Sequence, residues 1–584
     1  MRWGQSLFAP QLCGKQSGCR SQPWKLACTH LVVVPSMPGG NGRGVDWRAQ
    51  VEERFSMNRK TANWIGAALL TAMVAVSAAP AWAADANLQV KTKQGKVEGR
   101  MDGDVKAFLG IPFAAPPVGP LRWKPPMPAE KWSGVRLATG FGYRCMQPSI
   151  YHDMRFRDAG MSEDCLTLNV WTPAKNDHAK LPVMVWIYGG GYTAGSTSER
   201  RQDGAALTKN GVIVVTMNYR LGIFGFFANE DLAKESGKNA AGNYGLMDQM
   251  SALQWVKDNI AAFGGDPENV TLFGESAGSF SVCAQMASPL AKGLFKQVIG
   301  ESGGALYGSR GVSFKPLAET AEKDDTFART VLSATTLEQL RAIPASELLE
   351  DMMKKNEAGE TTRFSPVVDG YFLPESPAAI FAAGKQNDVP MLAGWNRDEG
   401  GYDPKVTVES FKAAVEKQFP EQAAELLALN PVTDDTSAIR ASADLAADRF
   451  IAYSTWKWIE AQTKTGKKPV YRFYFEQVAP PDPDHPVGLA AYHSSEIMYV
   501  FGDLDLVSSI GFHFRPEDHQ TSTAMQKYWT NFAKTGDPNG EGLPKWPVYA
   551  ADTQWQVMHL GPEPMAAPDR HRAQDLLLDS IWGK

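Results

Sequence analysis

A serine enclosed by glycines is the strongest candidate for a catalytic side chain. The G-E-S-A-G run at residues 274–278 follows an apolar segment at residues 270–273 and precedes a helical pattern. A strand, a G-x-S-x-G turn and a helix in this order form a sharp bend that exposes the serine hydroxyl at a helix N-terminus. Glycines are needed at both positions because larger side chains would collide with neighbouring backbone. The pattern predicts Ser276 as the nucleophile of an acyl transfer.

A serine hydroxyl is too weakly acidic to attack an ester unaided, so it needs a base that an acidic residue orients. In chains with this kind of turn, the acid and then the histidine follow the serine. We favour His493 as the base because it follows a strand predicted at residues 470–475 and a loop, and His513 is the alternative. The other histidines beyond the serine are His485, His519, His559 and His571.

Two adjacent carboxylates are candidates for the acid. An apolar segment at residues 389–394 ends in a turn that carries Asp398 and Glu399, and either could orient the histidine on chemical grounds. Another strand, predicted at residues 183–188, opens into three glycines at residues 189–191. Glycines let backbone N–H groups approach a reacting carbonyl without side chains in the way, so this run is a candidate oxyanion hole.

The elements around these residues alternate between strands and helices. Short β-branched runs, several of them almost continuously apolar, predict strands at residues 108–111, 166–171, 183–188, 212–218, 270–273, 297–301, 390–394 and 470–475. Such runs are typical of strands buried on both faces of a mainly parallel sheet that helices cover. Apolar spacing predicts a helix over residues 245–262, and residues 310–360 and 405–465 are expected to be helical insertions that cap the sheet.

Composition excludes several classes of protein. Of 584 residues, 43% are hydrophobic and 21% are charged, which is typical of a large soluble globular protein rather than of a disordered or membrane protein. With 59 Lys and Arg against 64 Asp and Glu, the chain offers no basic field for a phosphate backbone. We therefore expect no nucleic-acid partner.

The stretch from Met57 to Ala83 has the layout of a secretory signal peptide. Arg59 and Lys60 precede an apolar run that ends in small residues at positions 81 and 83, which predicts cleavage after Ala83. A transmembrane anchor is less favoured, because the run is short and no basic stop-transfer cluster follows it. The sequence thus predicts an exported protein, periplasmic or secreted, with no stable membrane anchor.

A signal peptide acts at the start of a chain, so we expect Met57 to be the true initiator. Residues 1–56 would then be absent from the native protein or form a disordered leader, and residues 84–584 would be a single domain with 50 basic and 61 acidic residues. The cysteines that remain in it are Cys145, Cys165 and Cys283. They allow at most one intramolecular bridge, for which Cys145 and Cys165 are the natural pair.

Several runs of the sequence resemble the type-B carboxylesterase and cholinesterase family of α/β-hydrolases, and the resemblance covers nearly the whole mature chain. These runs are residues 108–123 (FLGIPFAAPPVGPLRW), 162–170 (SEDCLTLNV), 218–226 (NYRLGIFGF), 242–249 (GNYGLMDQ), 263–270 (FGGDPENV) and 529–538 (WTNFAKTGDP).

The resemblance implies an α/β-hydrolase fold, with a large, mostly parallel sheet flanked by helices. It also implies a serine carboxylesterase that hydrolyses a small-molecule ester through an acyl-enzyme and requires no metal or cofactor. The residues it points to are Ser276 as nucleophile, Glu399 as acid, His493 as base, the backbone of Gly190, Gly191 and Ala277 as oxyanion donors, and a Cys145–Cys165 disulfide.

The sequence departs from the family pattern at two places. Tyr188 stands where many relatives have histidine, and since that side chain only supports the loop, the oxyanion role is expected to remain. Residues 146–164 contain no tryptophan, whereas cholinesterases place a cation-binding tryptophan there, which argues against a dedicated choline site. Two alternative functions stay open, namely a non-catalytic adhesion or interaction protein and an amidase or peptidase that uses the same triad.

Overall fold

A computed structural model describes residues 88–308, 312, 314–356, 358–401, 403–481 and 491–583. The chain divides into two units, residues 1–83 and residues 84–584, and every described residue belongs to the second. The predicted signal peptide and the predicted start at Met57 lie outside the described residues.

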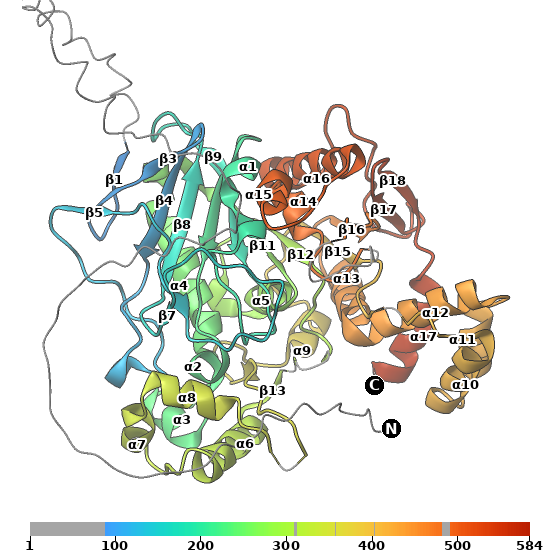
Figure 1. Cartoon of the computed structure of the whole chain (residues 1–584), viewed down its shortest axis with the longest axis horizontal. Helices are drawn as coiled ribbons and strands as arrows, with labels where there is room; N and C mark the ends of the chain where they lie inside the picture. Colours follow the sequence, from blue (N-terminus) through green and yellow to red (C-terminus); the bar gives the residue numbers. More distant parts are fainter. Residues whose placement is uncertain are drawn as a thin grey trace, which may run out of the picture. The chain divides into compact units, whose positions relative to one another are not determined.

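An 11-stranded sheet forms the centre of the described unit (Figure 1). Its strand order is β18-β17-β16-β15-β12-β11-β9-β10-β8-β4-β3. The strands are β3 (Arg100–Asp102), β4 (Val105–Pro112), β8 (Thr167–Thr172), β9 (Leu181–Ile187), β10 (Ile213–Met217), β11 (Gly265–Glu275), β12 (Gln297–Glu301), β15 (Met391–Asn396), β16 (Val470–Phe475), β17 (Gln556–Leu560) and β18 (Met565–Pro568). Neighbours from β10 to β17 run parallel, and antiparallel pairs flank them at both ends. The predicted α/β class is confirmed, and every predicted strand coincides with an observed one.

The register of the central strands brings their carboxyl ends to one edge of the sheet. Glu275 at the end of β11 pairs with Glu301 at the end of β12, and Glu301 pairs in turn with Gly394 of β15. All residues of β12 and β15 are buried, the polar Gln297, Glu301 and Asn396 at their ends included, as expected for strands covered on both faces. Side chains that directly follow these strands therefore gather at a single edge.

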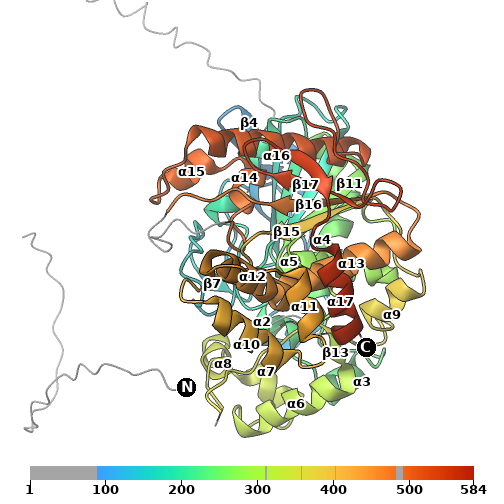
Figure 2. The same cartoon turned by 90° about the vertical axis from the view of Figure 1, so that its right-hand side faces the viewer.

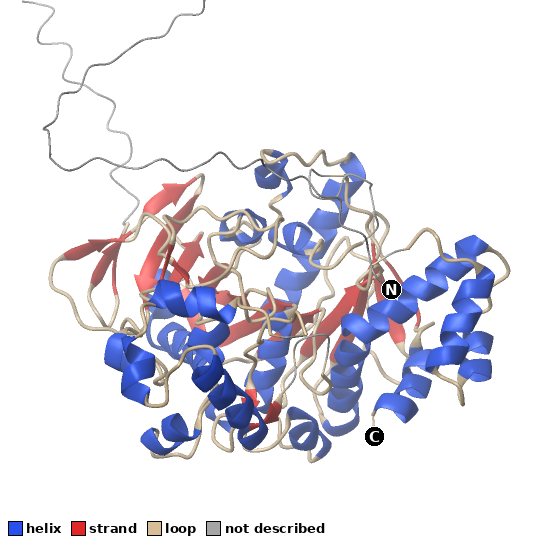
Figure 3. Ribbon diagram, turned by 60° about the horizontal axis from the view of Figure 1, so that its bottom comes forward, coloured by secondary structure: helices blue, strands red, loops and turns tan. Residues whose placement is uncertain are grey.

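Helices cover both faces of this sheet, as Figures 2 and 3 show. The helices that pack closest to it are α1 (Gly204–Thr208), α4 (Tyr244–Asn259), α5 (Ala277–Ala287), α13 (Tyr453–Thr465), α14 (Ile497–Phe501) and α16 (Pro516–Thr535). In Figure 2, α14 and α16 lie on one side of the strands and α5 and α13 on the other. Helix α4 confirms the helix predicted over residues 245–262: a 3₁₀ turn (Ile260–Phe263) extends it to Gly264, whose φ of 87° ends it.

Both predicted insertions are helical (Figure 1). The first contains α6 (Leu317–Thr330), α7 (Leu337–Ala342) and α8 (Ala345–Met352), and the second contains α10 (Val408–Gln418), α11 (Ala423–Leu429) and α12 (Asp435–Ala447). A π-helical segment (Asp448–Ala452) joins α12 to α13. Together they surround the sheet edge at which the candidate residues lie.

Short elements complete the described unit. These are the strands β1 (Gln89–Lys91), β2 (Lys96–Glu98), β5 (Val135–Leu137), β6 (Arg144–Cys145), β7 (Met161–Ser162), β13 (Lys315–Pro316) and β14 (Val367–Val368), the helices α2 (Gly222–Phe226), α3 (Glu230–Glu235), α9 (Pro377–Ala382), α15 (Leu504–Ser508) and α17 (Arg572–Trp582), and 3₁₀ turns at Gly119–Leu121, Arg200–Gln202 and Pro289–Ala291. Among the described helices, none combines the length and apolar character that crossing a bilayer requires.

Candidate active site

Ser276 stands at the bend between β11 and α5. Its φ of 53° and ψ of −121° are unusual for a residue with a side chain, and its backbone N–H donates to the carbonyl oxygen of Glu301 at 2.8 Å. A Cβ added to Gly278 would lie 1.9 Å from the carbonyl oxygen of Ile187, and one added to Gly274 would lie 2.6 Å from the same atom. The glycines are therefore needed for close backbone packing, as the sequence pattern predicts.

His493 and Glu399 lie in direct contact although 94 residues separate them. Nδ1 of the ring is 2.5 Å from Oε2 of the carboxylate. The other carboxylate oxygen accepts the backbone N–H of Asn396 at 2.9 Å and the hydroxyl of Ser302. Glu399 has no exposed side-chain surface, so these contacts fix the position of the carboxylate. Through the carboxylate they also fix the Nδ1 edge of the imidazole.

The alternative acid and base lie elsewhere. Asp398 accepts the backbone N–H of Ala491 at 3.0 Å and forms ion pairs with Arg397 and Arg440, so it joins loops and does not contact His493. His513 is exposed and does not line the cavity that holds Ser276. His485 lies outside the described residues.

Further carboxylates surround the ring of His493. Its Nε2 is 3.2 Å from Oε1 of Glu275, and Glu496 is buried nearby. Burial lowers the pKa of His493, but the negative charges of Glu399, Glu275 and Glu496 outweigh burial and raise the pKa to about 10. Burial raises the pKa of Glu275, and burial together with the charge of Glu399 raises the pKa of Glu496 to about 7. The protonation of the His493 ring and that of the surrounding carboxylates therefore depend on one another.

Ser276 and His493 line one cavity of about 610 Å³. Within the described chain, no hydrogen bond joins the Ser276 hydroxyl to the ring, whose Nε2 faces Glu275. The hydroxyl makes no cap bond to α5 either, so no capping bond has to break for it to turn. The structure thus brings the predicted acid and base into contact and sets Ser276 in the same cavity, without a direct bond between Ser276 and His493.

The three glycines after β9 form the wall of the cavity next to Ser276. Gly190 has a φ of 99°, and a Cβ there would lie 2.0 Å from the carbonyl oxygen of Ala194, so only glycine fits. In the described part of the chain, the N–H groups of Gly190 and Gly191 donate to no backbone carbonyl. Ala277 is the first residue of α5, where an N–H has no intrahelical partner. These amides are available to an anionic oxygen in the cavity.

Tyr188 supports this loop as the sequence suggests. Its ring stacks on that of Tyr219 at a centroid distance of 4.6 Å, and its hydroxyl donates to the carbonyl oxygen of Tyr219 at 3.3 Å. The hydroxyl of Tyr219 donates back to the carbonyl oxygen of Tyr188 at 2.9 Å. Both side chains are buried, so they stabilise the end of β9 just before the glycines.

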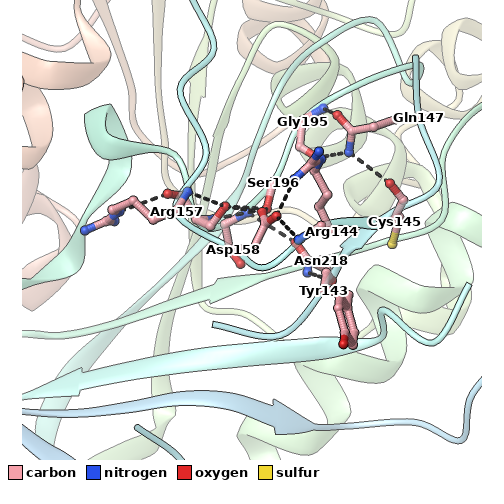
Figure 4. Close-up of polar contacts among 12 residues, drawn as sticks. Tyr143, Arg144, Cys145, Gln147, Arg157, Asp158, Gly195, Ser196 and Asn218 are labelled. Carbon is pink, nitrogen blue, oxygen red and sulfur yellow. Dashed lines mark hydrogen bonds and ion pairs between the residues drawn. The ribbon is translucent and has the colours of Figure 1, made fainter. Parts of the chain in front are cut away.

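The predicted disulfide is present: Cys145 and Cys165 are bonded, with an S–S distance of 2.02 Å. Figure 4 shows how the loop it closes is tied to the segment beyond the glycines. Gln147 donates to the carbonyl oxygen of Gly195 at 2.7 Å and accepts its N–H at 2.9 Å, while Asp158 accepts the hydroxyls of Ser196 and Ser198. The closed loop thereby contributes Tyr151, Asp153 and Met154 to the cavity wall.

Sequence reasoning did not identify several residues that shape this site. Ser302 and Asn396 position Glu399, while Glu275 and Glu496 set the charge around the ring. For two of them a signal existed, since Ser302 directly follows β12 and Glu275 lies inside the G-x-S-x-G turn, both at the carboxyl edge of the sheet. Among the described residues, no group of three or more His, Cys, Asp or Glu is arranged to hold a metal ion.

Comparison with known proteins gives consistent matches. The model of the carboxylesterase family matches residues 86–577. The chain is 38% identical over 483 residues to the para-nitrobenzyl esterase of Bacillus subtilis (strain 168), which covers 80% of this chain and 93% of that protein. It is 36% identical over 490 residues to the fumonisin B1 esterase of Sphingopyxis macrogoltabida, with 82% and 87% covered. A solved PNB esterase structure has a TM-score of 0.69 at 35% identity and covers 84% of this chain and 99% of its own.

Proposed function

The chain belongs to the carboxylesterase family and is a carboxylic ester hydrolase, and on this premise we propose that it is an exported enzyme whose triad is Ser276, His493 and Glu399. The observation that carries the triad is the 2.5 Å contact between Nδ1 of His493 and Glu399, made at the cavity that Ser276 lines. Because Nδ1 is engaged by Glu399, Nε2, now 3.2 Å from Oε1 of Glu275, is the ring nitrogen that must act on the serine.

In the first half of the reaction, Nε2 of His493 takes the proton of the Ser276 hydroxyl as Oγ attacks the ester carbonyl carbon. The resulting oxyanion accepts hydrogen bonds from the N–H groups of Gly190, Gly191 and Ala277. The imidazolium then donates its proton to the alkoxy oxygen, the C–O bond breaks, and the alcohol leaves. Glu399 holds the ring and stabilises its positive charge throughout.

In the second half, water attacks the acyl-enzyme. His493 removes a proton from the water, a second oxyanion forms at the same amides, and collapse returns the proton to Ser276 Oγ and releases the acid. The first proton transfer requires Ser276 Oγ to turn from its present position toward Nε2. The uncapped serine side chain supports this movement, and catalytic hydrogen bonds are often formed only once substrate is bound.

Export is part of the proposal. The basic head, the apolar run and the small residues of positions 57–83 support a cleaved signal peptide, followed by one domain at residues 84–584. The Cys145–Cys165 disulfide supports an oxidising compartment, either periplasmic or extracellular. N-terminal sequencing of the natively expressed protein tests this: a mature end at Ala84 is expected, whereas a peptide from residues 1–56 would contradict the assigned start.

The test of the triad begins with Ser276→Ala, assayed on para-nitrophenyl butyrate. We expect kcat to fall by about 10⁵-fold or more, since the nucleophile and its base act as a unit. A matched control is Ser509→Ala, which removes an exposed hydroxyl at the end of α15 and should leave turnover close to wild type. A serine-directed phosphonate should label the wild type and not Ser276→Ala.

Near-wild-type turnover by Ser276→Ala would refute the assignment of the nucleophile. Matched ester and amide substrates then define the reaction: we expect kcat/KM to be much higher for the ester, and the opposite ranking would identify an amidase.

A further inference from the structure

Two arginines line the cavity that holds Ser276, and their surroundings differ. Arg201 is nearly buried between two carboxylates, with an ion pair to Glu199 and another to Asp153 at 3.0 Å. Arg363 is exposed, and its guanidinium has no ion pair or hydrogen bond to any described residue. The charge of Arg201 is therefore neutralised inside the protein, whereas that of Arg363 is available to a ligand.

Arg363 also lies at the boundary with a second cavity. This neighbouring cavity has a volume of about 860 Å³ and shares Val312 and Arg363 with the first. Its other cationic residues are Lys315, Lys323 and Lys355, and Glu360 is the acid among the described residues that line it. The lining of this second cavity is thus locally basic, on a chain in which acidic residues outnumber basic ones.

The lysines of this second cavity are not equivalent. Lys315 is 3.1 Å from Glu319 and Lys323 is 3.2 Å from Asp324, so acidic neighbours compensate both. Lys355, like Arg363, has no acidic partner within the described ranges. Two uncompensated cations therefore remain in the cavity that adjoins the one holding Ser276, and they raise the local concentration of anions even where the whole chain is acidic.

Arg363 is close to the oxyanion loop as well as to solvent. The hydroxyl of Tyr151 lies 3.1 Å from the position that a Cβ on Gly191 would occupy. Burial raises the pKa of Tyr151, and the positive charge of Arg363 lowers it, which shows that the guanidinium acts on this hydroxyl. Tyr151, next to Gly191, and Arg363 therefore line the same cavity.

We propose that Arg363 determines specificity by binding a carboxylate that the ester substrate carries at the end remote from its scissile bond. The substrate class is an ester that retains a free acid, such as a monoester of a dicarboxylic acid. This inference rests on the proposed function of the Ser276 site. A guanidinium can hold a carboxylate through two parallel N–H···O bonds, and Lys355 adds attraction at longer range.

The surroundings of Arg363 suit its side chain to binding a substrate rather than to stabilising the fold. Because the guanidinium makes no hydrogen bond or ion pair with a described residue, replacing it removes no such bond from the described part of the fold. Because it is exposed, an ion pair with substrate is partly screened by solvent, and salt should weaken it.

The experiment compares mono-para-nitrophenyl adipate with para-nitrophenyl hexanoate, two esters with the same leaving group that differ in a terminal carboxylate. The measured quantity is the ratio of kcat/KM for the anionic ester to that for the neutral ester. We expect Arg363→Gln to lower this ratio about tenfold, Arg363→Glu to lower it further, and Arg363→Lys to retain part of it. Raising the salt concentration should lower the wild-type ratio more than the Arg363→Gln ratio, because the variant keeps only the longer-range attraction of Lys355.

A matched control is Arg136→Gln, which removes an arginine charge in β5, outside both cavities, and should leave the ratio unchanged. A second ester, 3-carboxy-4-nitrophenyl hexanoate, carries the carboxylate on the leaving group instead of the acyl group. Comparing the two anionic esters shows whether Arg363 binds a carboxylate on the acyl half or on the alcohol half. A preference for the anionic ester that depends on Arg363 in either series supports the proposal.

Equal ratios in the wild type, Arg363→Gln and Arg363→Glu, with both esters hydrolysed, would overturn the role of Arg363 and leave the proposed hydrolase function intact. Failure of the wild type to release nitrophenol from any of these esters would overturn the proposed function and the inference together. The two failures are therefore distinguishable in one set of assays.

Discussion

His493 with Glu399 and His559 with Glu476 are two histidine–glutamate pairs joined through the same ring nitrogen, but they differ in their surroundings. The Nδ1 to Oε2 distance is 2.5 Å in the first pair and 2.9 Å in the second. Glu399 has no exposed surface, whereas 29% of the Glu476 side chain is exposed. A histidine–carboxylate contact by itself therefore does not distinguish a candidate catalytic pair from a structural one.

The second oxygen of each carboxylate shows the difference. In Glu399 it accepts a backbone N–H and the hydroxyl of Ser302, and in Glu476 it lies 3.6 Å from the guanidinium of Arg570. Burial raises the pKa of Glu476, but its contact with His559 and the charge of Arg570 outweigh burial and lower the pKa. The Glu476 charge is thus balanced by a cation, while that of Glu399 is left to act on its histidine.

Replacing each histidine by alanine is the strongest test of this comparison. We expect His493→Ala to lower kcat by about 10⁵- to 10⁶-fold, because the serine loses its base. His559→Ala removes a ring of the same kind from β17, distant in the strand order from β11, and should leave kcat close to wild type. Steady-state hydrolysis of para-nitrophenyl butyrate measures both.

Comparable losses from the two histidine variants would contradict the distinction between the pairs. Thermal unfolding of both variants serves as a control, since His559 also contacts the ring of Tyr474 and its loss could lower stability without affecting the chemistry of the folded enzyme.

The acids give the next largest contrast. Glu399→Gln keeps an oxygen for the N–H of Asn396 but replaces the charge that holds and stabilises the imidazolium, so we expect kcat to fall about 10³- to 10⁴-fold. Glu476→Gln makes the same change in the partly exposed Glu476–His559 pair and should have little effect on kcat. If Glu399→Gln retained most of its activity, Glu399 would not be the acid of the triad.

The groups that position each carboxylate are expected to give the third largest contrast in kcat. Ser302→Ala removes a hydroxyl that donates to the buried Glu399 carboxylate, and a hydrogen bond to a charged group contributes about 1.5–3 kcal/mol. We expect kcat to fall about ten- to a hundredfold as the carboxylate loses its orientation. Arg570→Gln is the matched change beside Glu476, and its kcat should stay near the wild-type value. An unchanged kcat in Ser302→Ala would show that Asn396 alone suffices.

The sequence predicted the elements of this fold well because their signals are local. Short, largely apolar runs predicted β9, β11, β12, β15 and β16, and the glycine-enclosed turn made Ser276 the candidate nucleophile, since both signals depend only on residues near in the chain. The choice among six histidines had a weaker signal: chain order admitted all of them, and only the position after the predicted strand at residues 470–475 favoured His493. Only the family resemblance separated Glu399 from Asp398.

Local signals do not contain the register between distant strands. That register places Ser302, directly after β12, beside a carboxylate 97 residues further along the chain, and it brings Glu275 and Glu496 to the same imidazole. The sequence likewise could not predict that the charge of Arg363 is uncompensated. That depends on which acidic residues the fold places within ion-pair distance of the guanidinium.

The smallest expected effect concerns the pH dependence of the buried pair. His493 must be neutral to act as a base, so activity rises with pH as its ring loses a proton. Burial lowers the ring's pKa, and the carboxylates of Glu399, Glu275 and Glu496 raise it to about 10; Glu496→Gln removes one of these charges while keeping the shape of the side chain. The pKa of His493 should fall, and the acidic limb of the kcat/KM profile should move to lower pH.

The pKa of Glu496, raised to about 7 by burial and by Glu399, determines where the two profiles differ. Below that pH, Glu496 is mostly protonated in the wild type, so the wild type and the glutamine variant resemble each other, and above it they diverge. Glu476→Gln is the matched control, since it changes the charge beside His559 and should leave the profile in place. A shift of the acidic limb to higher pH in Glu496→Gln would mean that Glu496 acts on the ring by some means other than its charge.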